Sequence, residues 1–130
     1  MIIDSSALLA MMLSEPERRR LELAIANAGS CLISASTYLE SSMILISRAG
    51  IDAVRDLDLV LFRFSVTVVP FSEEQARIAR DAFSRYGNGR HPAQLNFGDC
   101  MAYALAKESG EELLFKGTEF AQTDIAVAAY

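Results

Sequence analysis

Short apolar runs alternate along the chain with longer stretches in which apolar residues recur at helical spacing. The apolar runs lie at residues 1–3, 31–33, 66–69 and 113–115. Short strands that alternate with helices predict an α/β fold with a largely parallel sheet covered on both faces. We expect one domain over residues 1–130, because no internal repeat, low-complexity tract or linker interrupts the pattern.

Capping residues and glycines divide the helical stretches. The signals at helix starts and ends predict six helices, which run from Ala7 to Leu13, from Pro16 to Ala28, from a Thr37–Glu40 capping box to Gly50, over 51–64, from a Ser72–Gln75 capping box to Tyr86, and from Asp99 to Gly110. The third and fourth should pack as a helical hairpin. Residues 125–127 are a candidate for a final edge strand.

One carboxylate, that of Asp99, stands at the start of a helix that is apolar on nearly every face. The run 101–106 contains Met, Ala, Tyr, Ala, Leu and Ala, as expected of a helix surrounded by other elements. An Asp at such a position is usually a cap, whose side chain accepts a hydrogen bond from a free backbone N–H. A further role for Asp99 depends on what else lies near it.

Three more carboxylates come shortly after predicted strands, namely those of Asp4, Glu40 and Glu119. In an open parallel sheet the segments that follow the strands begin at one edge, where ligands bind. We therefore expect these side chains to meet Asp99 there. Four neighbouring carboxylates repel one another unless a cation neutralises them. An all-oxygen set without Cys or His suits Mg²⁺ or Mn²⁺ and not zinc.

Such a site favours phosphodiester hydrolysis, because divalent ions polarise phosphoryl oxygens and activate water. Two other interpretations stay open. A phosphatase or phospho-acceptor domain also has an Asp after its first strand, although phosphatases of that type carry a second Asp where this chain has Ser6. A catalytically silent module could use the pocket to bind RNA or a partner protein, but concentrated negative charge does not favour RNA binding.

Composition narrows the class of protein. Hydrophobic residues make up 52% of the chain and the mean hydropathy is +0.22, yet no apolar run approaches the ~20 residues that span a bilayer. We expect a cytoplasmic protein without a signal peptide. The excess of apolar residues suggests a surface that a partner protein buries. The net charge of −5 argues against a general nucleic-acid coat. Cys31 and Cys100 lack metal-type spacing, which favours reduced thiols.

Several short motifs follow one another in a fixed order over almost all 130 residues. They are Met1-Ile2-Ile3-Asp4-Ser5-Ser6-Ala7-Leu8, Tyr38-Leu39-Glu40, Gly89-Arg90-His91, Leu95-Asn96-Phe97-Gly98-Asp99-Cys100, Leu113-Leu114-Phe115-Lys116-Gly117, Phe120, and Thr123-Asp124-Ile125. Each motif is weak, but their order and spacing together are specific. The chain resembles the PIN-domain ribonucleases and, among them, the VapC toxins of bacterial toxin–antitoxin pairs.

This resemblance implies a PIN-like three-layer α/β/α fold and a Mg²⁺-dependent endoribonuclease, in which Mn²⁺ can replace Mg²⁺. It also implies a cognate VapB-type antitoxin, whose tail fills a groove near the active site, and a homodimer within the toxin–antitoxin complex. By matching position, Asp4 and Asp99 would be the principal metal ligands. Glu40 would bridge to the metal or orient its water. Glu119 falls where many relatives carry an Asp in a fourth acidic motif.

Other residues are assigned supporting roles. Ser6 matches a hydroxyl that supports the site in the family, by hydrogen bonding to a carboxylate. Arg90, His91 and Lys116 are candidates for RNA contact, although Arg90 and Lys116 are almost equally expected to pair with surface acids. Asp124 is either a fifth acid of the site or a turn residue, and its sequence context favours the turn.

Overall fold

A four-stranded parallel sheet forms the centre of the protein in a computed structural model that describes all residues from 1 to 130. Its strands are β1 (Ile2–Ile3), β2 (Cys31–Ser34), β3 (Val66–Val69) and β4 (Leu113–Leu114). They lie in the order β3-β2-β1-β4, and every pairing is parallel. The predicted α/β fold with a short parallel sheet is confirmed.

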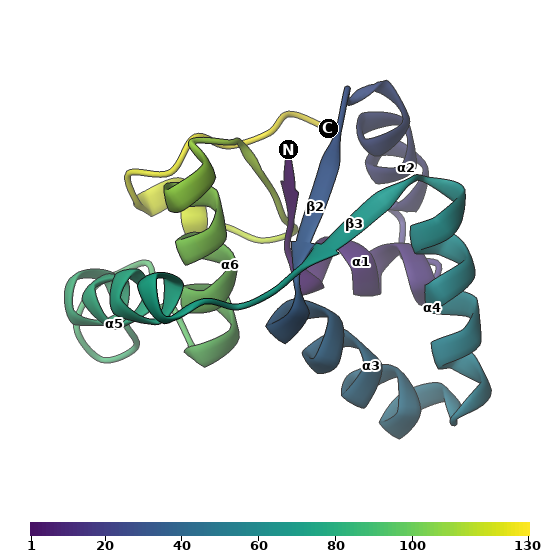
Figure 1. Cartoon of the computed structure of the whole chain (residues 1–130), viewed down its shortest axis with the longest axis horizontal. Coiled ribbons are helices and arrows are strands. Elements are labelled where there is room, and N and C mark those ends of the chain that lie inside the picture. The colour runs from purple at the N-terminus through teal and green to yellow at the C-terminus, as the bar shows by residue number, and fades with distance from the viewer.

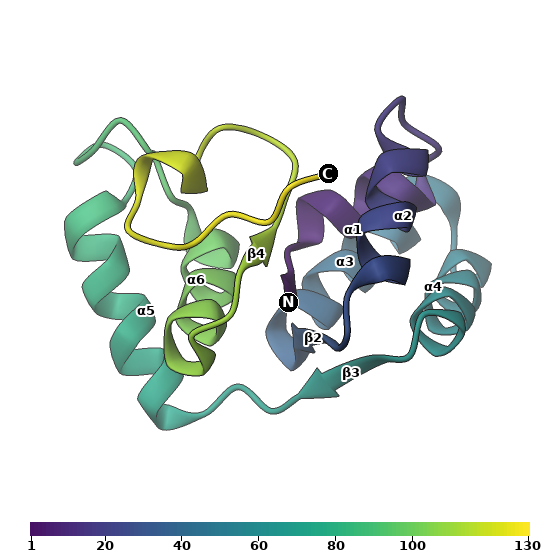
Figure 2. The ribbon, with the colours of Figure 1, turned by 90° about the horizontal axis from the view of Figure 1, so that it is seen from above.

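Six α-helices and one 3-10 turn surround the sheet. They are α1 (Ser5–Met12), α2 (Arg18–Asn27), α3 (Ala35–Ala49), α4 (Asp52–Arg63), α5 (Glu73–Tyr86), α6 (Phe97–Ser109) and the 3-10 turn η1 (Phe120–Gln122). Helices α1 to α4 lie on one side of the sheet and α5 and α6 on the other (Figure 1), an arrangement that the view from above also shows (Figure 2). Helices α3 and α4 pack together as the predicted hairpin.

The two faces of the sheet bury two separate cores, because successive side chains of a strand point to opposite faces. Ile2 and Leu113 belong to the core under α5 and α6, whereas Ile3 and Leu114 belong to the core under α1 to α4. All four side chains are fully buried. Packing on both faces of the sheet therefore fixes the ends of β1 and β4. It also fixes the points where the following segments begin.

Four helix starts differ from the sequence prediction. Helix α1 begins at Ser5 and not at Ala7, α2 begins at Arg18 and not at Pro16, and α3 and α6 both begin earlier than predicted. Helix α3 begins at Ala35 and its N-cap is Ser34, whose hydroxyl accepts a hydrogen bond from the Ser36 N–H at 3.3 Å. The predicted capping box at Thr37 is wrong, since Thr37 is a buried residue inside the helix. Strand β2 passes directly into α3, because Ser34 has the extended backbone that serves both a strand end and an N-cap. At α6, Asn96 and not Asp99 is the N-cap.

The C-terminal segment also differs in part. Residues 125–127 do not form an edge strand, and Val127 makes only an isolated parallel bridge to Leu113. Its neighbour Ala128 reaches the core under α1 to α4. No helix is both long and apolar enough to cross a membrane.

Candidate active site

An acidic pocket of about 280 Å³ lies where β1, β2 and β4 end. The four carboxylates that the sequence predicted to meet there all line it. The complete lining is Asp4, Ser5, Ser6, Leu9, Glu40, Ile44, Asn96, Asp99, Lys116, Glu119 and Phe120. Four separate segments of the chain therefore contribute one acid each to a single cavity, as the parallel topology requires. We call this cavity the acidic pocket.

Asp4 is the most deeply placed of the four acids, with only 2% of the residue exposed. It follows β1 and caps α1, since its Oδ2 accepts hydrogen bonds from the Ser6 N–H at 2.9 Å and the Ser6 hydroxyl at 2.6 Å. Its Oδ1 is buried and has no hydrogen-bond partner. Burial raises the pKa of Asp4 above its usual value, against the hydrogen bonds from Ser6, and the charge of Glu119 adds to the rise.

Ser6 connects two of the segments that form the pocket. Its Oγ donates to Asp4 and accepts a hydrogen bond from the Lys116 backbone N–H at 2.9 Å. The hydroxyl thus joins the end of β1 to the segment that follows β4. The supporting position expected for Ser6 agrees with this bridge to a carboxylate.

Asp99 closes a capping box at the start of α6. The Asp99 N–H donates to Asn96 Oδ1 at 3.0 Å, and the Asn96 N–H donates to Asp99 Oδ2 at 2.8 Å. Burial raises the pKa of Asp99 to about 6; the bond from Asn96 opposes the rise, and the charges of Asp4, Glu119 and Glu40 add to it. The cap therefore fixes the Asp99 carboxylate, and the negative charges of the other three acids repel it.

Glu40 reaches the pocket from the second turn of α3 and lies against the backbone of Gly98. A Cβ atom at residue 98 would stand only 2.6 Å from Glu40 Oε2 and 2.7 Å from Cδ. Real Cβ atoms essentially never come within 3.0 Å of another atom, so this approach requires glycine. Burial raises the pKa of Glu40, and the charge of Asp4 contributes to the shift.

Glu119 comes from the loop after β4 and precedes η1. Its Oε2 accepts a hydrogen bond from the Thr118 N–H at 2.8 Å. Gly117 makes the turn with a φ of 132°, which L side chains rarely adopt. A Cβ atom there would also lie 3.1 Å from Glu119 Cδ. The turn at Gly117 therefore lets the carboxylate fold back over the loop.

Lys116 is the one cationic side chain that lines the acidic pocket. Its Nζ pairs with Glu15 and, at 3.1 Å, with Glu17 Oε2, both from the segment between α1 and α2. The hydrogen bonds from Lys116 to these two glutamates raise its pKa. The expected pairing of Lys116 with surface acids is therefore present. Lys116 also lines the acidic pocket beside the carboxylates.

The other two candidates for RNA contact lie outside the acidic pocket, in the loop between α5 and α6. His91 Nδ1 accepts a hydrogen bond from the Ala93 N–H at 3.1 Å, and its ring packs edge-on against Tyr86 with 5.2 Å between centroids. The Arg90 guanidinium lies 5.6 Å from the ring centroid of Phe83. Both side chains therefore contact aromatic residues of α5.

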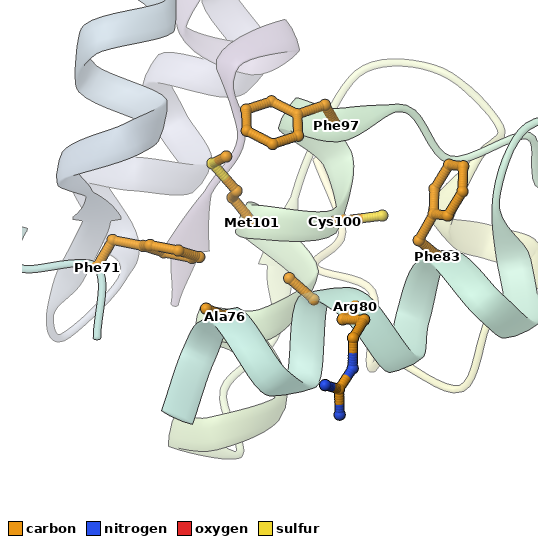
Figure 3. Close-up of a pocket in the computed structure, with 8 residues that line it drawn as sticks. Phe71, Ala76, Arg80, Phe83, Phe97, Cys100 and Met101 are labelled. Atoms are coloured by element: carbon orange, nitrogen blue, oxygen red, sulfur yellow. The ribbon is translucent and has the colours of Figure 1, made fainter. Parts of the chain in front are cut away.

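An apolar pocket of about 510 Å³ lies beside α5 and α6 (Figure 3). Its lining is Phe71, Ala76, Ala79, Arg80, Phe83, Phe97, Cys100 and Met101. Phe97 is 80% exposed, and the guanidinium of Arg80 points away from the cavity in Figure 3. Phe97 and Met101 also line a second apolar pocket with Leu39 and Met43 of α3. Apolar surface thus continues from α5 to α3 beside the acidic pocket.

The acids suit a divalent cation in their chemistry, and they line one pocket. Asp4 offers a buried oxygen with no partner, and the backbone holds one oxygen each of Asp4, Asp99 and Glu119. Hard carboxylate oxygens are the ligands that Mg²⁺ prefers. As they stand, no three acidic, His or Cys side chains are close enough to form a closed ligand set. The residues fit a metal ion whose charge would draw the repelling carboxylates together.

Sequence reasoning overlooked three parts of this site. Asn96 was available from the sequence, since Asn-x-x-Asp before an apolar run resembles a capping box, but only Asp99 was predicted as the cap. Gly98 stands inside the same pattern, yet nothing local indicates that Glu40 approaches it. The pairing of Lys116 with glutamates about 100 positions earlier depends on the tertiary fold alone.

Comparison with known proteins places these features in a family context. A family model described as "PIN domain" matches residues 1–126. A protein from Mycolicibacterium smegmatis named "Ribonuclease VapC" is 49% identical over 126 residues, which cover 97% of this chain and 98% of that protein. The crystal structure of VapC20 from Mycobacterium tuberculosis, described as a "Sarcin-Ricin loop cleaving toxin", superposes with a TM-score of 0.79 at 15% identity and covers 96% of this chain and 95% of its own. A chain from a "Toxin-antitoxin complex from Klebsiella pneumoniae" gives 0.73 at 18% identity, over 99% and 97%.

Proposed function

The chain belongs to the PIN-domain family, and on that premise we propose that it is a metal-dependent endoribonuclease that acts as the toxin of a toxin–antitoxin pair. The observation that carries the proposal is the acidic pocket, where four segments each supply one carboxylate at the edge of a parallel sheet. The relative from M. smegmatis, which is 49% identical over 97% of this chain, is named a ribonuclease, and this supports RNA as the substrate.

We propose that Mg²⁺, or Mn²⁺ in its place, binds to Asp4, Asp99 and Glu40, with Glu119 as a fourth acid beside them. When bound, such an ion supplies Lewis-acid polarisation of the phosphoryl group and a more acidic water. The unpaired Asp4 Oδ1 is the donor that most needs a cation, because a buried carboxylate oxygen without a partner is costly. The raised pKa values of Asp4, Glu40 and Asp99 have the same origin in burial and mutual repulsion.

The chain itself restrains these acids near one another before any ligand arrives. Ser6 fixes Asp4, the backbone of Asn96 fixes Asp99, and Gly98 makes room for Glu40. Fixed side chains lose little conformational freedom on binding, which favours catalysis through positioning. Lys116 places a positive charge beside the carboxylates, where it can contact a phosphate of the RNA backbone.

We also propose protein partners for the surface beside the site. The similarity to a chain of a toxin–antitoxin complex supports a VapB-type antitoxin that neutralises the enzyme, and a homodimer is expected within that complex. Exposed apolar side chains suit such partners, since large apolar patches on a soluble protein commonly mark interaction sites. The exposed apolar residues beside the acidic pocket include Leu39, Met43 and Phe97.

Cleavage of RNA by the purified protein tests the proposal. Structured and single-stranded RNAs are incubated with Mg²⁺, with Mn²⁺ and with EDTA, and the new RNA ends are sequenced. Wild type should cut only with a divalent ion, and Asp4→Asn and Asp99→Asn should not cut although they fold. Co-purified antitoxin should suppress the cleavage. RNA binding that is equal with EDTA and never leads to cleavage would instead support a silent binding module, and a covalent phosphoryl adduct at Asp4 would support a phosphatase.

A further inference from the structure

Asp124 collects more charged and polar contacts than any of the four acids, yet it does not line the acidic pocket. Its Oδ1 accepts a hydrogen bond from the Tyr103 hydroxyl at 2.6 Å. Its Oδ2 accepts from Lys107 Nζ at 3.0 Å and from Arg85 at 3.3 Å. Arg85 comes from α5, whereas Tyr103 and Lys107 come from α6. A residue of the C-terminal segment is thus bound to both helices that cover one face of the sheet.

Tyr103 is the rigid partner in this set. Its side chain is only 2% exposed and belongs to the core under α5 and α6, so its hydroxyl has little freedom to follow a moving loop. The two cations stand at the surface and are more than 40% exposed, where single ion pairs contribute little. The Tyr103–Asp124 hydrogen bond is therefore the contact that fixes the position of Asp124.

The chain between Asp124 and Glu119 is short and internally bonded. The Gln122 N–H donates to the Glu119 carbonyl at 3.2 Å, and the Thr123 hydroxyl donates to the Phe120 carbonyl at 2.7 Å. Phe120 is buried in the same core as Tyr103. These bonds make residues 119–124 one compact turn, so a displacement at Asp124 is transmitted to Glu119.

Two further contacts hold this turn, since Phe120 packs edge-on against Phe115 with 5.0 Å between ring centroids and the Gln122 side-chain amide donates to the Pro92 carbonyl at 3.4 Å. The turn belongs to no strand, and the segment after it touches the sheet through the bridge of Val127 and through Ala128. On its other side the loop begins at Lys116, which Ser6 holds through the backbone and Glu15 and Glu17 hold through the side chain. Glu119 thus lies between Lys116 and the buried Phe120, and Asp124 is the polar attachment point beyond η1.

We propose that Asp124 is a positioning residue, whose bonds to Tyr103, Lys107 and Arg85 hold the 119–124 turn and so keep the Glu119 carboxylate in the acidic pocket. The inference rests on the proposed function and deepens it, because it assigns a structural cause to the placement of the fourth acid. Asp124 itself contacts neither the substrate nor the metal in this account.

A double-mutant cycle between Asp124 and Glu119 tests the inference. The four proteins are wild type, Asp124→Ala, Glu119→Gln and the double variant, and each is measured for kcat and KM on one RNA, for Mn²⁺ affinity by calorimetry, and for melting temperature. Tyr103→Phe removes the rigid partner from the opposite side. Asp81→Asn is the matched control, because Asp81 is an exposed acid of α5 whose only ion pair is with adjacent Arg80.

If Asp124 acts through Glu119, Asp124→Ala should lower kcat about tenfold and leave KM nearly unchanged, since a displaced group costs rate and not RNA affinity. Mn²⁺ affinity should fall several-fold, Tyr103→Phe should give the same pattern, and Asp81→Asn should match wild type. In the Glu119→Gln background, Asp124→Ala should cause no further loss.

Two results would overturn the inference. One is an equal loss from Asp124→Ala in both backgrounds, which would mean that Asp124 acts independently of Glu119. The other is a lowered melting temperature with unchanged kcat and Mn²⁺ affinity, which would reduce Asp124 to a stabilising contact. If wild type binds Mn²⁺ but cuts no RNA, the proposed function fails, and the Mn²⁺ affinities of the same four proteins still decide the positioning role. If wild type neither binds Mn²⁺ nor cuts RNA, the proposed function and the positioning role both fail.

Discussion

Replacing Gly98 with alanine should separate the stability of this protein from its activity. Gly98 lies in the first turn of α6, and a Cβ atom there would stand 2.6 Å from Glu40 Oε2. Ordinary van der Waals contact begins at 3.4 Å and Oε1 is nearer still, so the carboxylate must retreat by at least about 0.8 Å, the difference between the two distances. A misplacement of about 1 Å at a catalytic group can cost about 10²-fold in rate. We expect a loss of that order in kcat.

The same substitution should not weaken the fold. Alanine restricts the unfolded chain more than glycine does, and a compatible Gly→Ala change stabilises by about 0.4–1 kcal/mol. The colliding atoms are the end of a flexible glutamate side chain, which can turn aside into the open pocket. We therefore expect the melting temperature to rise by about 2–4 °C, in contrast to the usual effect of a substitution that inactivates an enzyme.

The assay pairs RNA cleavage under saturating Mg²⁺ with thermal unfolding in the same buffer. Gly29→Ala is the matched control, because no atom lies within 4 Å of the place that its Cβ would take, and it should leave cleavage unchanged. Full activity in Gly98→Ala would refute the argument that Glu40 must lie against Gly98. A fall in melting temperature with normal activity per folded molecule would refute it equally.

Three further predictions concern other parts of the structure. Asp4→Asn removes a buried charge, so in EDTA at pH 7 the melting temperature of the variant should equal or exceed that of wild type. Its RNA cleavage should fall by more than about 10²-fold, since mutation even of the residues that support a metal ligand costs 10–100-fold. A lower melting temperature in EDTA would contradict the raised pKa of Asp4. The hydrogen bond from Tyr103, together with Lys107 and Arg85, lowers the pKa of Asp124 to about 2. The Asp124 carboxylate therefore stabilises the fold at pH values above its unfolded pKa of ~3.9, and this stabilisation is lost as the pH falls toward 2. Urea titrations between pH 5 and 2 should show a flatter decline for Asp124→Asn, and an unchanged pH dependence would count against the bond. Ser34→Ala removes the N-cap of α3 and should cost about 1 kcal/mol of unfolding free energy, measured by urea unfolding; no loss would show that another group caps the helix.

The pattern of the sequence was sufficient to predict the layout of the site. Strand ends precede Asp4, Glu40 and Glu119, and a parallel sheet brings such ends to one edge, which is where the structure places all three with Asp99. That inference needs only topology, so errors of a few residues in element boundaries did not affect it. The misplaced cap at Thr37 is such an error, because several Ser and Thr residues stand in a row and any of them fits the capping pattern.

Contacts that depend on tertiary distance were beyond sequence reasoning. Lys116 and Asp124 both looked like surface residues or turn residues in their local context. Their partners are Glu15 and Glu17 in one case and Tyr103 of a distant helix in the other. No local pattern encodes these pairs, because they arise from the way the segment after β4 passes between α1 and α6. The same reason hid the contact of Glu40 with Gly98.

The central claim is that one divalent cation site joins the four carboxylates, and diffraction from crystals soaked in Mn²⁺ tests it most directly. The anomalous signal of Mn²⁺ locates the ion independently of any assay of activity. The account predicts a peak in the acidic pocket between Asp4, Asp99 and Glu40, and loss of the peak in crystals of Asp99→Asn. An empty pocket at saturating Mn²⁺, or a peak that persists unchanged in the Asp99→Asn variant, would contradict it.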